Sequence, residues 1–97
     1  MNQKIALITG ATAGIGYETA LLLAQNNYNL ILTGRRKERL DALENKLKSS
    51  FNCQIVTLNF DIRIKTETEH ALNSLPDEWK AVDLLVNNAG LAAGFAP

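Results

Sequence analysis

The chain has 97 residues, which is enough for one small domain and too few for two. Ten basic and ten acidic residues cancel to a formal net charge of zero, which argues against a nucleic-acid binder that depends on bulk positive charge. A single cysteine, Cys53, excludes an internal disulfide framework and fits a reducing compartment. No apolar run approaches the roughly 20 residues of a membrane span, and the N-terminus lacks a signal-peptide pattern. These features predict a cytoplasmic protein that binds neither membranes nor nucleic acid.

Four short apolar segments bounded by turn residues predict strands over residues 5–9, 28–33, 54–59 and 82–86. Such runs are typical of strands buried on both faces of a parallel sheet. Between them, apolar residues at helical spacing predict helices over residues 15–26, 37–48 and 64–75. Strands that alternate with helices indicate an α/β fold with right-handed crossovers. The expected buried stripes are Ile15, Thr19, Leu22 and Leu23 in the first helix, Leu40, Leu43 and Leu47 in the second, and Ile64, Thr68, Ala71, Leu72 and Leu75 in the third.

Three glycines lie between the first predicted strand and the first predicted helix, in the pattern Gly10-x-x-x-Gly14-x-Gly16. The first permits a tight turn, the second lets the backbone approach a diphosphate, and the third lets the helix pack closely on the sheet. Free N–H groups at the helix start attract an anion, to which the Thr12 hydroxyl can also donate. A glycine-rich turn without a ligand is the alternative, but the strand–turn–helix context favours a dinucleotide. The cofactor-binding residues expected in this loop are Gly10, Thr12, Gly14, Ile15 and Gly16.

The residues after the second predicted strand indicate which dinucleotide is bound. Sites that prefer NAD commonly place Asp or Glu ~20 residues after the glycine motif, whereas this chain has Gly34-Arg35-Arg36 there. Arg35 and Arg36 can bind a 2′-phosphate through paired N–H donors, which predicts NADP. The alternative is that both arginines are solvated residues before a helix. A P-loop is excluded because no Gly-Lys-Ser/Thr follows the glycines, and the missing acidic residue disfavours a Rossmann methyltransferase.

Two segments resemble the signatures of the short-chain dehydrogenase/reductase family. Residues 9–16, TGATAGIG, are similar to its cofactor signature, and residues 87–90, NNAG, are similar to its second signature. The resemblance covers the whole chain and implies a Rossmann-type doubly wound sheet of local order 3-2-1-4, cut off after the fourth strand. It also implies that the Asp61 carboxylate faces the adenine amino group and the Ile62 N–H faces a ring nitrogen. Three further residues, Asn88, Ala89 and Gly90, are then placed along the adenosine ribose and the approach to nicotinamide.

A narrower resemblance concerns the substrate. Residues 33–40, 75–79 and 85–92 are similar to the NADP-dependent 3-hydroxy acid dehydrogenases. Those enzymes act on substrates of the L-allo-threonine, serine and 3-hydroxypropionate type. The resemblance therefore implies an oxidoreductase for a small hydroxy acid or amino-hydroxy acid, assembled as a homo-oligomer (a tetramer or a dimer).

The catalytic residues of that family are missing from this sequence. The family uses a Ser, a Tyr-x-x-x-Lys and a helical Asn, and no Tyr-x-x-x-Lys occurs among these residues. Residues 1–97 are therefore expected to form the N-terminal part of a single dinucleotide-binding domain and to carry no catalytic residue. The alternatives are a non-catalytic NADP-binding module and a truncated product without function. Truncation would leave the fourth strand as an unpaired apolar edge, so the isolated piece is expected to be poorly stable.

Three other residues receive structural interpretations. His70, between acidic neighbours on a helix, is expected to be a surface residue. Cys53 is expected to be a small, partly buried apolar side chain. Trp79 is expected to pack the third helix or its following loop onto the sheet.

Overall fold

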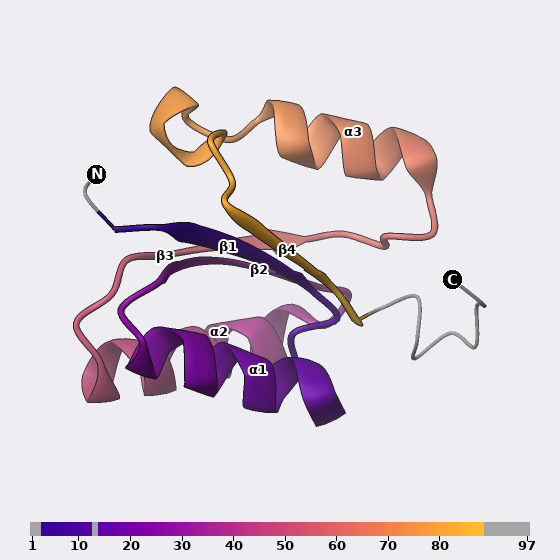
Figure 1. Ribbon diagram of the computed structural model, residues 1–97. Helices are drawn as coiled ribbons and strands as arrows, with labels where there is room; N and C mark the ends of the chain where they lie inside the picture. The colour runs from indigo at the N-terminus through magenta and orange to yellow at the C-terminus, as the bar shows by residue number, and fades with distance from the viewer. Residues whose placement is uncertain (1–2, 13, 89–97) are drawn as a thin grey trace.

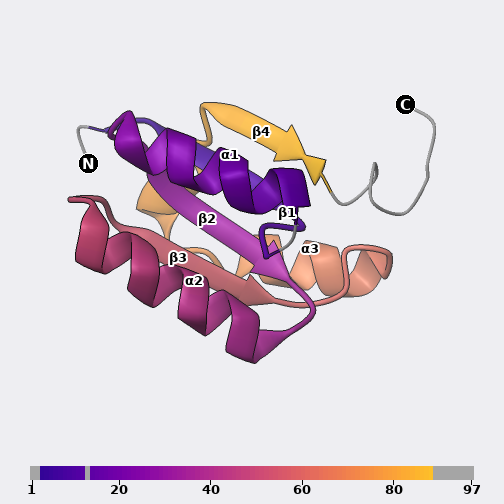
Figure 2. The same ribbon diagram turned by 90° about the horizontal axis from the view of Figure 1, so that it is seen from below.

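The computed structural model describes residues 3–12 and 14–88, which form a parallel sheet between two layers of helices (Figure 1). The four strands lie in the order β3-β2-β1-β4, which confirms the predicted order. Helices α1 and α2 cover one face of the sheet, and α3 lies on the other (Figures 1 and 2). The elements are β1 (Ile5–Thr9), α1 (Gly14–Gln25), β2 (Asn29–Gly34), α2 (Lys37–Ser50), β3 (Ile55–Asn59), α3 (Lys65–Asn73), the 3-10 helix η1 (Asp77–Trp79) and β4 (Leu84–Asn87).

The two central strands are buried and the two outer strands are not. All of β1, and β2 up to Thr33, is buried, as predicted for strands covered on both faces. The same prediction is wrong for β3, which is mostly half-buried, and for β4, which is mostly exposed. The reason is that each has one strand neighbour in the described sheet, and no described helix covers β4.

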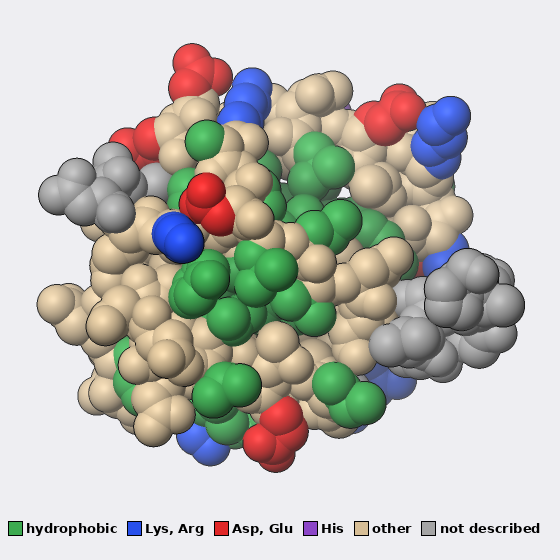
Figure 3. Space-filling model, viewed as in Figure 1, with side chains coloured by type: hydrophobic (Ala, Val, Ile, Leu, Met, Phe, Trp, Pro, Cys, Tyr) green, Lys and Arg blue, Asp and Glu red, His purple; other side chains and the backbone are tan. Residues whose placement is uncertain are grey.

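Two of the three exposed residues of β4 are apolar, namely Leu84 and Leu85. Leu85 is 60% exposed, and Val82 and Leu84 are also exposed. Figure 3, viewed as in Figure 1, shows apolar side chains gathered in the middle of the molecule's front face, over β4. Within residues 3–12 and 14–88, β4 pairs with β1 alone.

Helix α2 follows its sequence prediction. Its three leucines Leu40, Leu43 and Leu47 are buried against the sheet, while the charged positions between them face outward. The three leucines are separated by three and four residues, so all of them lie on one face of the helix. The predicted stripe of this helix is confirmed.

Helix α1 buries a different face from the one predicted. Its buried residues are Gly16, Ala20 and Ala24, which repeat every four residues. The predicted stripe residues Ile15 and Leu22 are 68% and 58% exposed. Small side chains let the helix backbone lie close to the sheet, and the bulkier Tyr17, Leu21 and Leu23 pack around them as half-buried residues. The stripe prediction is therefore wrong for Ile15 and Leu22, whereas Thr19 and Leu23 are half-buried and Leu23 packs against the core. It missed the glycine and the alanines because they contribute little apolar bulk.

The other face of the sheet is covered by the segment that follows α3. No residue of α3 itself is fully buried, and the predicted stripe residue Ile64 is exposed. The other stripe residues are half-buried or buried, and Leu72 and Leu75 pack on the core of this face. The helix ends at Asn73, and Leu75 and Trp79 then pack on Ile5, Leu7 and Ile31. The predicted structural role of Trp79 is thus confirmed. Within the described residues, no helix is both long and apolar enough to cross a membrane.

Candidate functional site

The glycine loop connects β1 to α1 by two turns that require glycine. Gly10 has a φ of 63° and Gly14 a φ of 55°, a region in which residues with a Cβ are strained. Between them, the Ala11 N–H donates to the carbonyl oxygen of Thr33 at 3.0 Å, which ties the loop to the end of β2. The loop therefore lies at the carboxyl edge of the sheet, where ligands bind in open α/β folds.

Gly16 marks the closest approach of α1 to this loop. A Cβ at this position would lie 2.2 Å from the Gly10 carbonyl oxygen and 2.8 Å from Asn88 Nδ2. The same Asn88 Nδ2 donates to the Gly10 oxygen at 3.2 Å, and the Asn88 residue is only 7% exposed. The two predicted signatures, 78 residues apart in sequence, thus meet at one carbonyl group. The third glycine is required because backbone fills the place of its side chain.

Gly14 has open space where Gly16 has none. A Cβ on Gly14 would meet no atom within 4 Å, and α1 begins at this residue. The N–H groups of a helix's first turn have no partners within the helix, and the helix dipole adds partial positive charge there. The start of α1 therefore offers room, donors and a favourable potential for a diphosphate, so the residues present fit the dinucleotide that the sequence predicts.

The arginine pair follows β2, next to the glycine loop. Gly34 lies close to Thr12, since a Cβ on Gly34 would be 3.4 Å from Thr12 Cγ2. Arg35 and Arg36 come next and are exposed, and Arg36 is the N-cap residue of α2 without a side-chain cap. Two guanidinium groups are thus available beside the loop. A cavity of about 230 Å³ between α1 and α2 adjoins Thr12 and is also lined by Arg39 and Lys46.

The end of β3 brings Asp61 beside these arginines. The Gly34 carbonyl oxygen accepts hydrogen bonds from Asn59 Nδ2 at 2.9 Å and from the Phe60 N–H at 3.1 Å. Arg35 and Asp61 follow directly after these bonded residues. The pKa of the Asp61 carboxyl is lowered mainly by hydrogen bonds from Arg63, and the positive charge of Arg35 adds a smaller contribution. The predicted residues of the second and third strands therefore lie on one side of the site.

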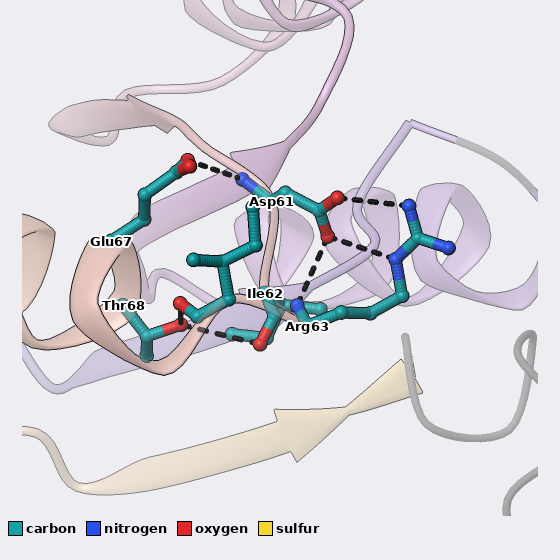
Figure 4. Close-up of polar contacts among 6 residues, drawn as sticks. Asp61, Ile62, Arg63, Glu67 and Thr68 are labelled. Atoms are coloured by element: carbon teal, nitrogen blue, oxygen red, sulfur yellow. Dashed lines mark hydrogen bonds and ion pairs between the residues drawn. The ribbon is translucent and has the colours of Figure 1, made fainter.

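Asp61 is held by a residue that sequence reasoning missed. Both carboxylate oxygens of Asp61 accept hydrogen bonds from Arg63, as Figure 4 shows. The bonds from the Arg63 side chain, and then from its backbone N–H, lower the pKa of Asp61 to about 2. This contact could have been predicted from the opposite charges of Asp61 and Arg63, which lie two positions apart in the loop between a strand and a helix. Ile62, between them, is half-buried.

Several expectations lie beside or outside this site. Ala89 and Gly90 are outside the described residues. His70 is exposed, and Cys53 is half-buried with its pKa raised by burial. A cavity of about 430 Å³ lies between β3 and α3, away from the glycine loop. Among the residues that the structure describes, no group of three potential ligands could hold a metal ion.

Known proteins are similar to this chain in sequence. A probable NADP-dependent dehydrogenase of Haemophilus influenzae is 48% identical over 97 residues, which is 100% of this chain and 37% of that protein. An NADP-dependent 3-hydroxy acid dehydrogenase of Salmonella typhi is 44% identical over 93 residues, or 96% of this chain and 36% of that protein. The chain therefore spans about a third of the length of these relatives.

A solved structure extends the likeness to three dimensions. It is the closed form of a serine dehydrogenase complexed with NADP+, at a TM-score of 0.75 and 38% identity. The match covers 84% of this chain and 31% of the other. A family model described as short chain dehydrogenase matches residues 4–97. With nearly its whole length matched, the chain belongs to the short-chain dehydrogenase family.

Proposed function

We propose that residues 1–97 are the N-terminal part of a single dinucleotide-binding domain and form the adenosine and diphosphate side of an NADP site. The observation that carries this proposal is the meeting of the glycine loop, the arginine pair and Asp61 at the carboxyl edge of one parallel sheet. Relatives whose names include NADP-dependence support the choice of cofactor.

The glycine loop would hold the diphosphate. Gly10 and Gly14 shape the turn, Gly16 lets α1 lie close, and the first N–H groups of α1, with that of Ile15 among them, face the anion. The Thr12 hydroxyl adds a donor. When bound, the nicotinamide ring of NADP accepts or donates the hydride.

The arginine pair would decide between the two nicotinamide dinucleotides. A 2′-phosphate carries close to two negative charges, and a guanidinium can bind it with two parallel N–H donors. Arg35 and Arg36 are exposed beside Thr12, and β2 ends without an acidic residue that would accept a bond from a free 2′-hydroxyl. This arrangement favours NADP over NAD.

The adenine base of the cofactor would be bound by the residues that follow β3. Asp61 would accept from the adenine amino group, and the Ile62 N–H would donate to a ring nitrogen. Asn88 braces the loop through its bond to Gly10, beside the ribose position. Ala89 and Gly90 remain predicted cofactor-binding residues.

For the whole protein we propose hydride transfer between NADP(H) and a small hydroxy acid or amino-hydroxy acid. The names of the relatives, a 3-hydroxy acid dehydrogenase and a serine dehydrogenase, support this substrate class. The catalytic Ser and Tyr-x-x-x-Lys of the family have no counterpart in the 97 residues, so the reaction itself requires residues beyond them. The alternative is an NADP-binding module of the same fold without catalysis. A cytoplasmic location and a homo-oligomeric state remain predictions.

The cofactor proposal is tested by replacing Arg35. In the whole protein, Arg35→Ala is expected to raise the Kd for NADP roughly 10- to 100-fold, because bonds to a charged phosphate are lost. The Kd for NAD should change little. The matched control is Lys80→Ala, which removes one exposed positive charge before β4, at the opposite end of the sheet. Equal weakening of NADP and NAD binding by Arg35→Ala would contradict the assignment.

The reaction is tested with substrates. Purified whole protein is incubated with NADP and, separately, with serine, L-allo-threonine or 3-hydroxypropionate, and NADPH formation is followed by absorbance. We expect turnover with at least one of the three. Binding of NADP without turnover of any of them would favour the non-catalytic alternative.

A further inference from the structure

The loop between β3 and α3 holds one carboxylate in a fixed orientation. Oδ1 of Asp61 accepts from the Arg63 backbone N–H and from Arg63 Nε, both at 3.0 Å, and Oδ2 accepts from Arg63 Nη2 at 2.8 Å. Figure 4 shows the guanidinium facing both oxygens at once. A planar guanidinium that bonds both oxygens fixes the plane of the carboxylate as well as its position.

The backbone of this loop is fixed as well. The Ile64 N–H donates to the Asp61 carbonyl oxygen at 3.0 Å, and Thr68 Oγ1 donates to the Ile62 carbonyl oxygen at 3.2 Å. The Asp61 N–H donates to Glu67 Oε1 at 3.4 Å. These bonds hold the turn of the loop without the Arg63 side chain. The Arg63 guanidinium therefore acts on the Asp61 carboxylate and not on the loop backbone.

Arg63 leaves few acceptor positions on Asp61. A carboxylate has about four lone-pair sites, two on each oxygen. Oδ1 accepts two bonds and is filled, whereas Oδ2 accepts one and keeps a single site. The Asp61 side chain is 20% exposed, so this remaining acceptor can still reach a ligand. A carboxylate is ionised at neutral pH and cannot donate, and the lowered pKa of Asp61 extends this state to more acidic solution.

The residue that follows Asp61 in the sequence, Ile62, carries a backbone donor. No acceptor among the described residues is recorded for the Ile62 N–H, whereas the N–H groups of Asp61, Arg63 and Ile64 are all bonded. One free acceptor beside one free donor matches the edge of adenine, which offers an amino donor beside a ring-nitrogen acceptor. The same pair does not match hypoxanthine, which offers a carbonyl acceptor beside a ring N–H donor. Acceptor would then face acceptor, and donor would face donor.

We propose that Arg63 is a positioning residue for adenine recognition: by clamping Asp61, it leaves only one acceptor, on Oδ2, aimed at the 6-amino group. Arg63 thereby sets a preference for a 6-amino purine over a 6-oxo purine. This inference rests on the proposed binding of NADP at this site. It assigns to Arg63 an effect on base selectivity, whereas a purely structural ion pair would affect all ligands alike.

The test compares NADP with its deamino form, nicotinamide hypoxanthine dinucleotide phosphate. The Kd of each is measured in the whole protein for the wild type, Arg63→Ala and Arg63→Lys. We expect the wild type to prefer NADP by roughly tenfold or more, since a mismatched acceptor faces the carboxylate. Arg63→Ala should reduce this preference several-fold because the carboxylate can rotate. Arg63→Lys keeps the charge without the two-pronged fork and should not restore it.

Two further variants separate the possible outcomes. Lys65→Ala removes a nearby exposed charge from the first turn of α3 and should leave the preference unchanged. In an Asp61→Asn background, Arg63→Ala should have no further effect on the preference, because Arg63 acts through Asp61. An unchanged preference in Arg63→Ala would overturn the inference. Failure of the wild type to bind NADP at all would instead overturn the proposed function.

Discussion

Helices α1 and α2 lie side by side on the same face of the sheet, yet they contact it in opposite ways (Figure 2). Helix α2 inserts three leucines, whereas α1 contacts the sheet through Gly16, Ala20 and Ala24. The leucines supply apolar area, and the small residues supply proximity. The small residues bring the N-terminus of α1 close to the Gly10 carbonyl, where we propose that it faces a diphosphate, whereas α2 is an ordinary amphipathic helix.

This difference is tested most severely at Gly16. Gly16→Ala places a Cβ 2.2 Å from a backbone oxygen, so α1 must move away from the loop. We expect a loss of unfolding free energy on the order of 5 kcal/mol together with loss of NADP binding. Chemical denaturation of the whole protein measures the first and titration the second.

The matched control for Gly16 is Gly14→Ala in the same loop. Its Cβ meets no atom within 4 Å, so the cost is the strain of a positive φ, about 1–2 kcal/mol. An equal loss of unfolding free energy in Gly16→Ala and Gly14→Ala would contradict the claim that close backbone approach requires a glycine at position 16.

The leucine contact of α2 is broken by Leu47→Ala. Leu47 is fully buried, so its truncation removes apolar contacts and leaves a cavity. We expect a cost of about 3 kcal/mol, within the 2–5 kcal/mol range for such changes. The midpoint of denaturant unfolding gives the value, and NADP affinity should remain close to that of the wild type. A cost below 1 kcal/mol would mean that α2 is not held to the sheet by its leucines.

The close contact of α1 with the sheet is tested by Ala20→Leu, which enlarges a buried side chain where Leu47→Ala shortens one. Ala20 has no exposed surface, and a larger side chain must push α1 outward. We expect a cost of about 2 kcal/mol. Unlike Leu47→Ala, this variant should also weaken NADP binding, because the start of α1 moves with the helix. Unchanged NADP affinity in a destabilised variant would separate the packing of α1 from the site.

Most of the fold was predictable from local sequence. The four strands and three helices follow from apolar runs and helical spacing, and their bounds agree with the structure to within two residues. The stripe of α2 was predictable because leucines are both large and periodic. The buried face of α1 was not, because glycine and alanine repeat with the same period but contribute little to an apolar stripe.

The site was predictable in outline and not in its cross-connections. The glycine spacing indicated the turn, and the structure gives Gly10 and Gly14 the positive φ that such a turn requires. The bond from Asn88 to Gly10 joins residues 78 positions apart and depends on the sheet order. The clamp of Arg63 on Asp61 depends on the backbone of one short loop, which propensity does not specify. Roles in cofactor binding stay predictions for all of these residues.

The most direct test of the proposed site is a crystal structure of the whole protein with NADP. We predict the diphosphate at the N-terminus of α1 in front of Gly14, and the 2′-phosphate within ion-pair distance of Arg35 or Arg36. The adenine amino group should donate to Oδ2 of Asp61, with Arg63 still bonded to both carboxylate oxygens. An adenosine moiety bound away from the ends of β2 and β3, or a diphosphate away from the glycine loop, would contradict the proposal.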